Sequence, residues 1–340
     1  DTKRSADVRA RLDALSEHPA AWERRLRRWR RHHRPLQTLV AGRLAPSRAT
    51  DNFIYQALVG LWPIGSGVRA TDDDRWLAEL KTRLTAYIQK AVREAKVSTS
   101  WTDPDAEYEQ AIETFIAAML ARPANARFLH DVEQFVGLLA PQGQWNTLAR
   151  LVVHLTAPGV PDIYQGDELS FRALVDPDNR RPVDFAARER ALEAIAGETE
   201  VQVPPFARDD IGALAENDRL KLYVTTRLLH LRASRGALFS AGGYVPLAAE
   251  GARAAHVVAF QRTHHDEAAL VVVPRLSFGL GTDVPIREVW GDTIVRLPAA
   301  GAVRAWRCEL GGQVVHPRDG GLLLADLSAR FPVAVLTPHR

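Results

Sequence analysis

The sequence predicts a chain of two fold classes, in which an α/β part with a large helical insertion precedes an all-β part that forms an antiparallel β-sandwich. Helical periodicity dominates residues 5–139, and β-rich runs follow residue 236. Between them, residues 145–168 read as a helix, a tight turn, a short buried strand and a polar loop. That order is the repeating unit of an α/β barrel, in which the loops at the strand ends carry the chemistry.

The helical elements are predicted from caps and apolar stripes. Ser5 is the expected N-cap of the first helix. Apolar residues recur at helical spacing in five further segments, namely residues 51–62, 74–96, 105–120, 145–156 and 217–235.

The β part is predicted from β-rich runs separated by Gly and Pro. These runs are residues 256–260, 268–273, 293–297, 303–306 and 333–336. Their spacing is typical of a small antiparallel sandwich, with its boundary near residues 236–243.

Composition places the chain among ordinary globular proteins. Of its 340 residues, 46% are hydrophobic and 25% are charged, which excludes disordered, collagen-like and disulfide-scaffold classes. No apolar run reaches the roughly 18 residues of a membrane span, and no signal-peptide pattern opens the chain. Cys308 is the only cysteine, so neither an internal disulfide nor a cysteine-based zinc site is expected. These features predict a cytoplasmic protein without a membrane partner.

Positive charge is concentrated in a helix near the N-terminus. Residues 1–34 carry eleven Lys and Arg against five Asp and Glu. Trp22, Leu26 and Trp29 form one stripe of a helix that Pro35 ends, and arginines cover the rest. One interpretation is a nucleic-acid-binding protein built on the basic helix 22–34. The other is a surface helix that docks its tryptophans, and we favour it because no nucleic-acid fold signature accompanies the arginines.

Standard nucleotide, zinc-protease and serine-hydrolase motifs are missing from the sequence. The adjacent histidines 32–33 and 264–265 lack the helical spacing of metal ligands. We therefore expect them to be solvated surface side chains and predict no metal site.

Carboxylates, amides and arginines gather in residues 161–168 and 174–184. Sugar recognition needs such groups because hydroxyls both donate and accept, and Tyr164 could pack against a pyranose face. The structural alternative makes Asp176 and Asp178 turn caps paired with Arg180 and Arg181. Spacing alone does not separate the two interpretations.

Several segments resemble maltooligosyltrehalose synthase, a family of the α-amylase superfamily. They follow one another in order as DTKRSADVRAR at 1–11, AKVSTSWTDPD at 95–105, APGVPDIYQGDE at 157–168, LVDPDNRRPVD at 174–184 and ADLSARFPVAVLT at 325–337. The resemblance implies the C-terminal portion of an α-amylase-type (β/α)8 barrel. Residues 1–14 would end strand 7, 15–140 would be a helical insertion, 141–236 would hold strand 8 and the final helices, and 237–340 would form the β-sandwich.

The resemblance also implies a reaction and a site. Family members convert the reducing-end α-1,4 bond of a maltooligosaccharide into an α,α-1,1 bond with retention of configuration, and a maltooligosyltrehalose trehalohydrolase acts downstream. Asp1 takes the position of the third catalytic carboxylate. The nucleophile and the acid/base lie earlier in the family sequence, so we expect these 340 residues alone to be inactive. No metal, organic cofactor or nucleic acid is implied. Another α-glucan hydrolase or transferase of the superfamily remains the alternative.

Substrate contacts are expected from nine further residues. By the resemblance, Lys3 approaches the reducing end and Arg4 contacts substrate or pairs with an acid. The helical insertion would cover the pocket, with Trp101 and Asp103 in its wall, although Trp101 could equally serve helix packing. The remaining expected contacts are Tyr164, Gln165, Asp178, Asn179 and Arg180.

Overall fold

The computed structural model describes residues 3–64, 73–196, 218–281, 284–298 and 303–339. The chain divides into two units, of which the first comprises residues 1–140 and 171–182 and the second comprises residues 141–170 and 183–340. Each unit has its own hydrophobic core. The four-segment division expected from the sequence is finer than this one and stays a prediction.

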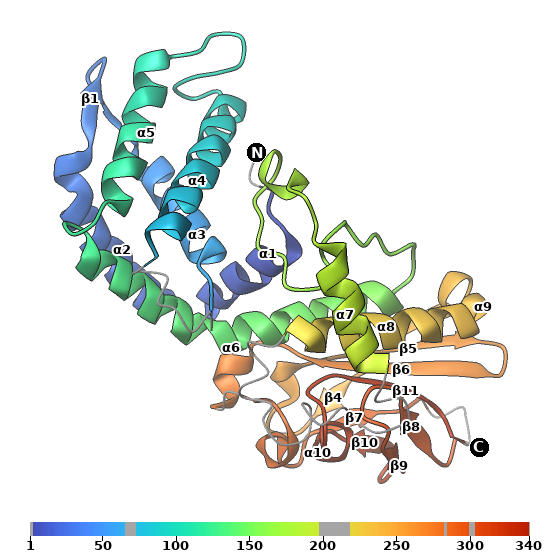
Figure 1. Ribbon diagram of the computed structural model, residues 1–340. Helices are drawn as coiled ribbons and strands as arrows, with labels where there is room; N and C mark the ends of the chain where they lie inside the picture. Colours follow the sequence, from blue (N-terminus) through green and yellow to red (C-terminus); the bar gives the residue numbers. More distant parts are fainter. Residues whose placement is uncertain (1–2, 65–72, 197–217, 282–283, 299–302, 340) are drawn as a thin grey trace. The chain divides into compact units, whose positions relative to one another are not determined.

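Helices build most of the first unit (Figure 1). They are α1 (Ala6–Asp13), α2 (Pro19–His33), α3 (Arg48–Leu61), α4 (Asp74–Ala95), α5 (Ala106–Leu120) and the first half of α6 (Ala126–Thr156). A short antiparallel hairpin, β1 (Thr38–Val40) with β2 (Arg43–Ala45), joins α2 to α3. The side chain of Ser5 caps α1 as predicted, and those of Asp73 and Asp105 cap α4 and α5 in the same way.

The tryptophan stripe of α2 packs into the core of the first unit. Trp29 is 1% exposed, and Trp22 and Leu26 pack against the same cluster, so the predicted docking face is confirmed. The expectation that both histidines of the 32–33 pair are solvated is wrong for His33. Its ring is buried and contacts the hydroxyl of Tyr55 at 2.8 Å, because it lies one turn after Trp29 on the same side of the helix.

Helix α6 is longer than its sequence pattern predicts. The apolar pattern predicts a helix over residues 145–156, whereas α6 runs for 31 residues and contains Pro141. The boundary between the two units falls at this proline. Proline removes one hydrogen bond from a helix, and apolar side chains such as Leu139 and Trp145 keep both halves buried.

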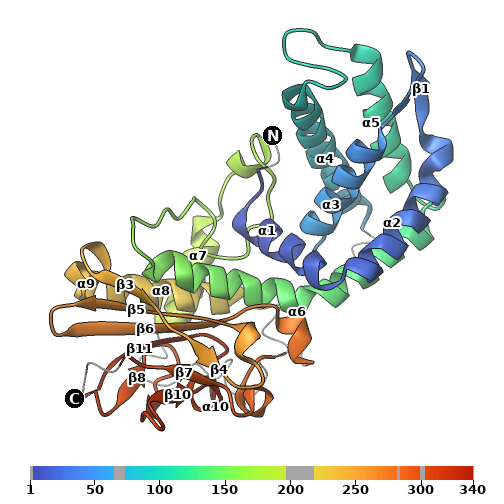
Figure 2. The ribbon, with the colours of Figure 1, turned by 180° about the vertical axis from the view of Figure 1, so that it is seen from behind.

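The second unit combines the second half of α6 with α7 (Phe185–Ala196), α8 (Asp218–Ser234) and α9 (Gly236–Ser240), followed by two antiparallel sheets (Figure 2). The larger sheet has the order β3-β5-β6-β11-β8-β9, and the smaller sheet has the order β10-β7-β4. Their strands are β3 (Gly243–Pro246), β4 (Ala249–Glu250), β5 (Val257–His264), β6 (Glu267–Pro274), β7 (Ile294–Arg296), β8 (Trp306–Cys308), β9 (Val314–Val315), β10 (Gly321–Leu323) and β11 (Ala334–Pro338). Helix α10 (Leu324–Leu327) follows β10.

The predicted helical part followed by a sheet-rich part is therefore present. One core joins the two sheets to α6 and α8, with Leu148, Leu228, Val271 and Val295 among its buried residues. The short buried strand expected at residues 160–164 is not observed among the described residues, where Val160 is 96% exposed. An extended segment becomes a strand only when a neighbouring strand binds it, and the described residues place none beside it.

Within the described part of the chain, no helix combines the length and the hydropathy needed to cross a membrane.

Candidate functional site

One face of α4 collects the N-terminal segment and the loop formed by residues 174–181. Arg83, Tyr87 and Lys90 lie at positions i, i+4 and i+7, so they share this face. Arg83 and Lys90 bind the loop, and the ring of Tyr87 lies 6.0 Å from the guanidinium carbon of Arg4. Arg4 and Leu174 form an isolated antiparallel bridge, which joins the two segments directly.

Asp178 anchors the loop 174–181 to α4. The side chain is 4% exposed, and its carboxylate accepts hydrogen bonds from the Leu174 amide at 2.8 Å and from Nε and Nη2 of Arg83 at 2.7 and 3.1 Å. Nε of Arg181 lies 3.4 Å from the same group. The paired arginine of the structural interpretation is therefore present. The expected contact between Asp178 and substrate stays a prediction.

The neighbouring side chains of the loop are more accessible. Asp176 binds Lys90 at 2.7 Å and Arg180 at 3.2 Å. The hydrogen bond from Lys90, with the charges of Lys90 and Arg180, lowers the pKa of Asp176. The side chain of Arg180 is 69% exposed, whereas Oδ1 of Asn179 is buried without a hydrogen-bond partner.

The N-terminal segment contributes the half-buried guanidinium of Arg4. Asp1 lies outside the described residues, and Lys3 is exposed. The guanidinium of Arg4 lies 4.8 Å from the centroid of the Phe53 ring, and its interaction with the Tyr87 hydroxyl favours the charged form. Burial lowers the pKa of Arg4.

Buried polar side chains lie on this face of α4 and in the loop 174–181. Arg4 and Tyr87 interact through the guanidinium and the hydroxyl, whereas Oδ1 of Asn179 has no hydrogen-bond partner. A buried polar group without a partner costs free energy, so such groups mark places where a ligand or a water molecule completes the hydrogen bonding. Oδ1 of Asn179 is therefore an acceptor suited to a ligand hydroxyl group.

The loop 96–105, between α4 and α5, carries Trp101 and Asp103. Both residues are exposed, Trp101 by 56%. The guanidinium of Arg93 lies 4.8 Å from the centroid of the Trp101 ring, so the indole packs against an arginine of α4 and does not enter the hydrophobic core. Lys90 and Arg93 are one turn apart on α4, which brings this loop and the loop 174–181 to the same helix.

Tyr164 and Gln165 belong to the second unit. They lie at a turn closed by a hydrogen bond of 3.0 Å from the Asp167 amide to the Tyr164 carbonyl. Gly166, with φ at +91°, occupies the third position of that turn, where a left-handed conformation is required. Both Tyr164 and Gln165 are exposed.

The acids that follow this turn are held by buried or half-buried cations. Asp167 pairs with Lys221 at 2.8 Å, and Glu168 pairs with Nε of Arg188 at 2.9 Å. The turn is thereby fixed from both α7 and α8.

Seven of the nine expected substrate contacts thus lie in the first unit, namely Lys3, Arg4, Trp101, Asp103, Asp178, Asn179 and Arg180. Sequence reasoning missed the side chains that hold them, above all Arg83, Lys90 and Glu109. Charged residues at positions 83 and 90, two turns apart on one helix, were a usable signal.

The arginines of α2 are largely occupied by ion pairs. Arg30 binds Asp51 at 2.6 Å, and Arg25 lies 3.7 Å from Asp131. Arg27 binds Glu23 of the same helix at 2.5 Å. These pairs favour the interpretation of α2 as a docked surface helix.

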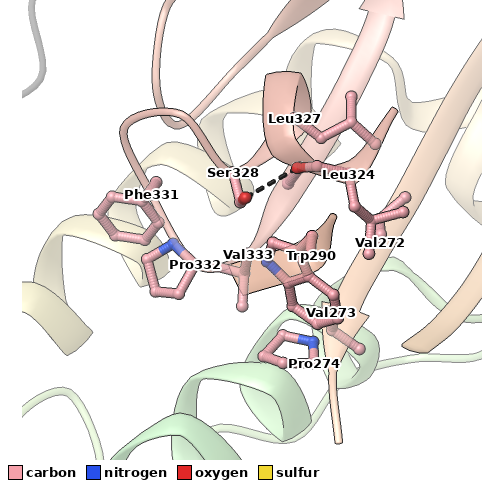
Figure 3. A pocket seen from close by; sticks show the side chains of 11 residues that line it. Val272, Val273, Pro274, Trp290, Leu324, Leu327, Ser328, Phe331, Pro332 and Val333 are labelled. Atoms are coloured by element: carbon pink, nitrogen blue, oxygen red, sulfur yellow. Dashed lines mark hydrogen bonds between the residues drawn. The ribbon is translucent and has the colours of Figure 1, made fainter. Parts of the chain in front are cut away.

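A small apolar cavity of the second unit, lined by residues of β6, β11, α10 and their neighbours, lacks the features of a binding site (Figure 3). Its one hydroxyl, that of Ser328, donates to the Leu324 carbonyl at 2.7 Å and accepts from the Arg287 amide at 3.1 Å. Ligand sites need polar groups that are free to orient the ligand. No group of three or more His, Cys, Asp or Glu side chains among the described residues could hold a metal ion.

Comparisons with known proteins place this architecture. No protein-family model matches the chain. A Mycobacterium tuberculosis protein named "Putative maltooligosyl trehalose synthase" is 32% identical over 336 residues, which is 99% of this chain and 36% of that protein. The chain therefore spans little more than a third of the curated relatives that it matches.

Solved structures of similar sequence carry the same enzyme name. The maltooligosyltrehalose synthase from Arthrobacter ramosus is 36% identical with a TM-score of 0.73, and the match covers 100% of this chain and 37% of that chain. A "hypothetical maltooligosyl trehalose synthase" from Sulfolobus tokodaii is 27% identical with a TM-score of 0.65, covering 99% and 37%. Over its whole length, the chain is homologous to the C-terminal part of maltooligosyl trehalose synthases.

Proposed function

We propose that this chain forms part of an enzyme that converts the reducing-end α-1,4 bond of a maltooligosaccharide into an α,α-1,1 bond. The observation that carries the proposal is the match along the entire chain to the Arthrobacter ramosus synthase, at 36% identity and a TM-score of 0.73. The reaction is an intramolecular transglucosylation that belongs to trehalose biosynthesis.

The chemistry retains configuration, because the bond that is broken and the bond that is formed are both α. Two displacements through a glycosyl-enzyme intermediate give that outcome, with carboxyl groups about 5 Å apart. Asp1 would act as the third carboxylate and stabilise the positive charge of the oxocarbenium-like transition state. The nucleophile and the acid/base would come from the remaining two thirds of the family's length.

The released glucose must turn and attack through its anomeric hydroxyl before water does. A closed pocket and firm positioning of the acceptor meet that demand. The helices of the first unit are proposed as the cover, and Lys3, Arg4, Asn179 and Arg180 as groups that hold sugar hydroxyls. The buried, unpaired Oδ1 of Asn179 supports this assignment.

The finer architecture is proposed on the same homology. Residues 1–14 and 141–236 would complete an α-amylase-type (β/α)8 barrel, residues 15–140 would form its helical insertion, and residues 237–340 would form a β-sandwich. The enzyme would act in the cytoplasm without metal or organic cofactor, and a maltooligosyltrehalose trehalohydrolase would consume its product.

The test uses the gene product that contains these residues, with maltohexaose as substrate. We expect reducing ends to disappear without release of an equal amount of glucose, and we expect Asp1→Asn to abolish the loss. A polypeptide of the 340 residues alone should show no turnover. Hydrolysis without a non-reducing product would instead assign an amylase-like activity, and turnover by the 340 residues alone would contradict the assignment of the missing carboxylates.

A further inference from the structure

Trp101 is exposed to solvent, yet one face of its ring is held by a neighbouring arginine. It is 56% exposed, yet the guanidinium of Arg93 lies 4.8 Å from its ring centroid. A cation against one face fixes the orientation of an indole, and the exposed area then belongs to the opposite face and the edge.

Arg93, which lies against the indole, is itself held by Glu109 of α5. The carboxylate is 7% exposed and receives hydrogen bonds from Arg93 at 2.7 and 2.6 Å, from Thr99 at 2.7 Å and from Gln89 at 3.0 Å. The two bonds from Arg93 run in parallel from Nε and Nη2, the bidentate geometry that fixes a guanidinium most firmly.

The backbone of the loop 96–105 is fixed by the same network. Oγ1 of Thr99 accepts the Asp105 amide at 3.0 Å, and Oγ of Ser100 accepts the Asp103 amide at 2.9 Å. Glu109 therefore fixes both the indole and the loop backbone, because it binds Arg93, which lies against the indole, and Thr99, which binds the backbone of the loop.

We infer that Trp101 is a stacking platform for one glucosyl unit of an α-1,4-glucan, and that Glu109 is the positioning residue that sets its orientation. The axial C–H groups of a pyranose match the face of an aromatic ring, and sugar sites pair such a face with a few polar groups. Thr102 and Asp103, which follow Trp101 in the loop, are exposed and carry oxygen atoms that can bind hydroxyls. The choice of an α-1,4-glucan rests on the proposed function.

The position of the platform agrees with that role. Lys90, one turn before Arg93 on α4, binds Asp176 in the loop that carries Asn179 and Arg180. A glucan that reached Oδ1 of Asn179 in the loop 174–181 could extend towards Trp101, since both loops are held by the same helix. Trp101 would then contact a sugar unit and Glu109 would act through Arg93.

The experiment measures the affinity of the gene product for maltohexaose by calorimetry at a temperature where turnover is slow, alongside KM and kcat. Trp101→Ala should weaken binding about tenfold, as truncation of a well-placed aromatic anchor does. Trp101→Phe should restore much of the affinity. Glu109→Gln, which removes the charge but keeps the shape, should weaken binding about three- to tenfold, mainly through KM.

Coupling between the two positions separates positioning from simple structural damage. In the Trp101→Ala background, Glu109→Gln should change affinity by less than about twofold, because the platform that it sets is already gone. Glu113→Gln, an exposed carboxylate one turn later on α5, is the matched control and should have no effect. Phe185→Ala, at a 59% exposed aromatic of the second unit, controls for loss of any surface aromatic ring.

Two outcomes overturn the inference. Unchanged affinity in Trp101→Ala, with or without a lower melting temperature, would make Trp101 a packing residue. An equal loss from Glu109→Gln in both backgrounds would remove the positioning role. The proposed function fails separately, when the unaltered gene product binds maltohexaose but forms no non-reducing product.

Discussion

Replacement of Asp178 by alanine should destabilise the first unit far more than the same change at Asp176, two residues earlier in the same loop. Asp178 is 4% exposed and its chief partner, Arg83, is 12% exposed. Asp176 is 32% exposed, and its partners Lys90 and Arg180 are 17% and 69% exposed. The two carboxylates therefore form a matched pair that differs mainly in burial.

The loss of stability in each variant depends on which partner groups remain unpaired once the carboxylate is removed. Without Asp178, the Leu174 amide loses its acceptor and Arg83 keeps only its bond to the Arg172 carbonyl and a weak approach to Glu79. Breaking a buried ion pair from one side costs about 3–5 kcal/mol, and the lower end applies because Arg83 retains some solvent contact. The pairs of Asp176 contribute less, because solvent screens them more.

Urea unfolding of the gene product, followed by circular dichroism, measures both changes. The Asp178→Ala variant should unfold at clearly lower urea concentration, with the slope of the transition unchanged. Because Asn179 and Arg180 lie in the same loop, KM for maltohexaose should rise in this variant as well. Equal stability of the two variants would refute the view that burial of Asp178 anchors the loop.

Three further changes test the structure elsewhere. Arg262 is fully buried and donates to four carbonyl oxygens at 2.8–3.2 Å, so Arg262→Met should cost about 3–4 kcal/mol in urea unfolding, with partial rescue by Lys. Burial lowers the pKa of His33 from 6.5 to about 3, so between these values the unfolded state binds a proton that the folded state does not. Stability should therefore fall as the pH decreases from 6.5 towards 3, and His33→Gln should flatten that dependence when unfolding is measured across this range. Gly166→Ala should cost about 1 kcal/mol of stability in thermal unfolding and raise KM, because φ is +91° there. A pH dependence unchanged by His33→Gln, or full stability of either other variant, would contradict these assignments.

Periodicity predicted most elements because burial follows it closely. The stripe of α4, including Leu80, Leu84 and Ile88, is fully buried, and four of the five β-rich runs correspond to β5, β6, β7 and β11. The run 303–306 overlaps β8 only at Trp306. The prediction failed where tertiary packing outweighed the local sequence pattern. Pro141 lies inside α6, His33 is buried, and residues 160–164 show no strand.

The candidate site was predictable as residue types but not as an arrangement. Carboxylates, amides and arginines in residues 174–184 indicated either sugar binding or turn capping. The structure gives Asp178 its structural partners, while it leaves Oδ1 of Asn179 buried and unpaired. Such a difference depends on which side chains of α4 face the loop, and those lie about 90 positions earlier in the sequence.

By itself, the sequence determined the helical and β-rich parts, the docking stripe of α2 and the resemblance to a family, since all of these are local patterns along the chain. The tertiary structure alone decided that Arg83 and Lys90 hold the loop 174–181 and that Glu109 fixes Arg93 under Trp101. It also decided which charges are buried, as for Arg262. The physical reason is that hydrogen bonding and desolvation depend on distances between residues remote in sequence, which no local pattern records.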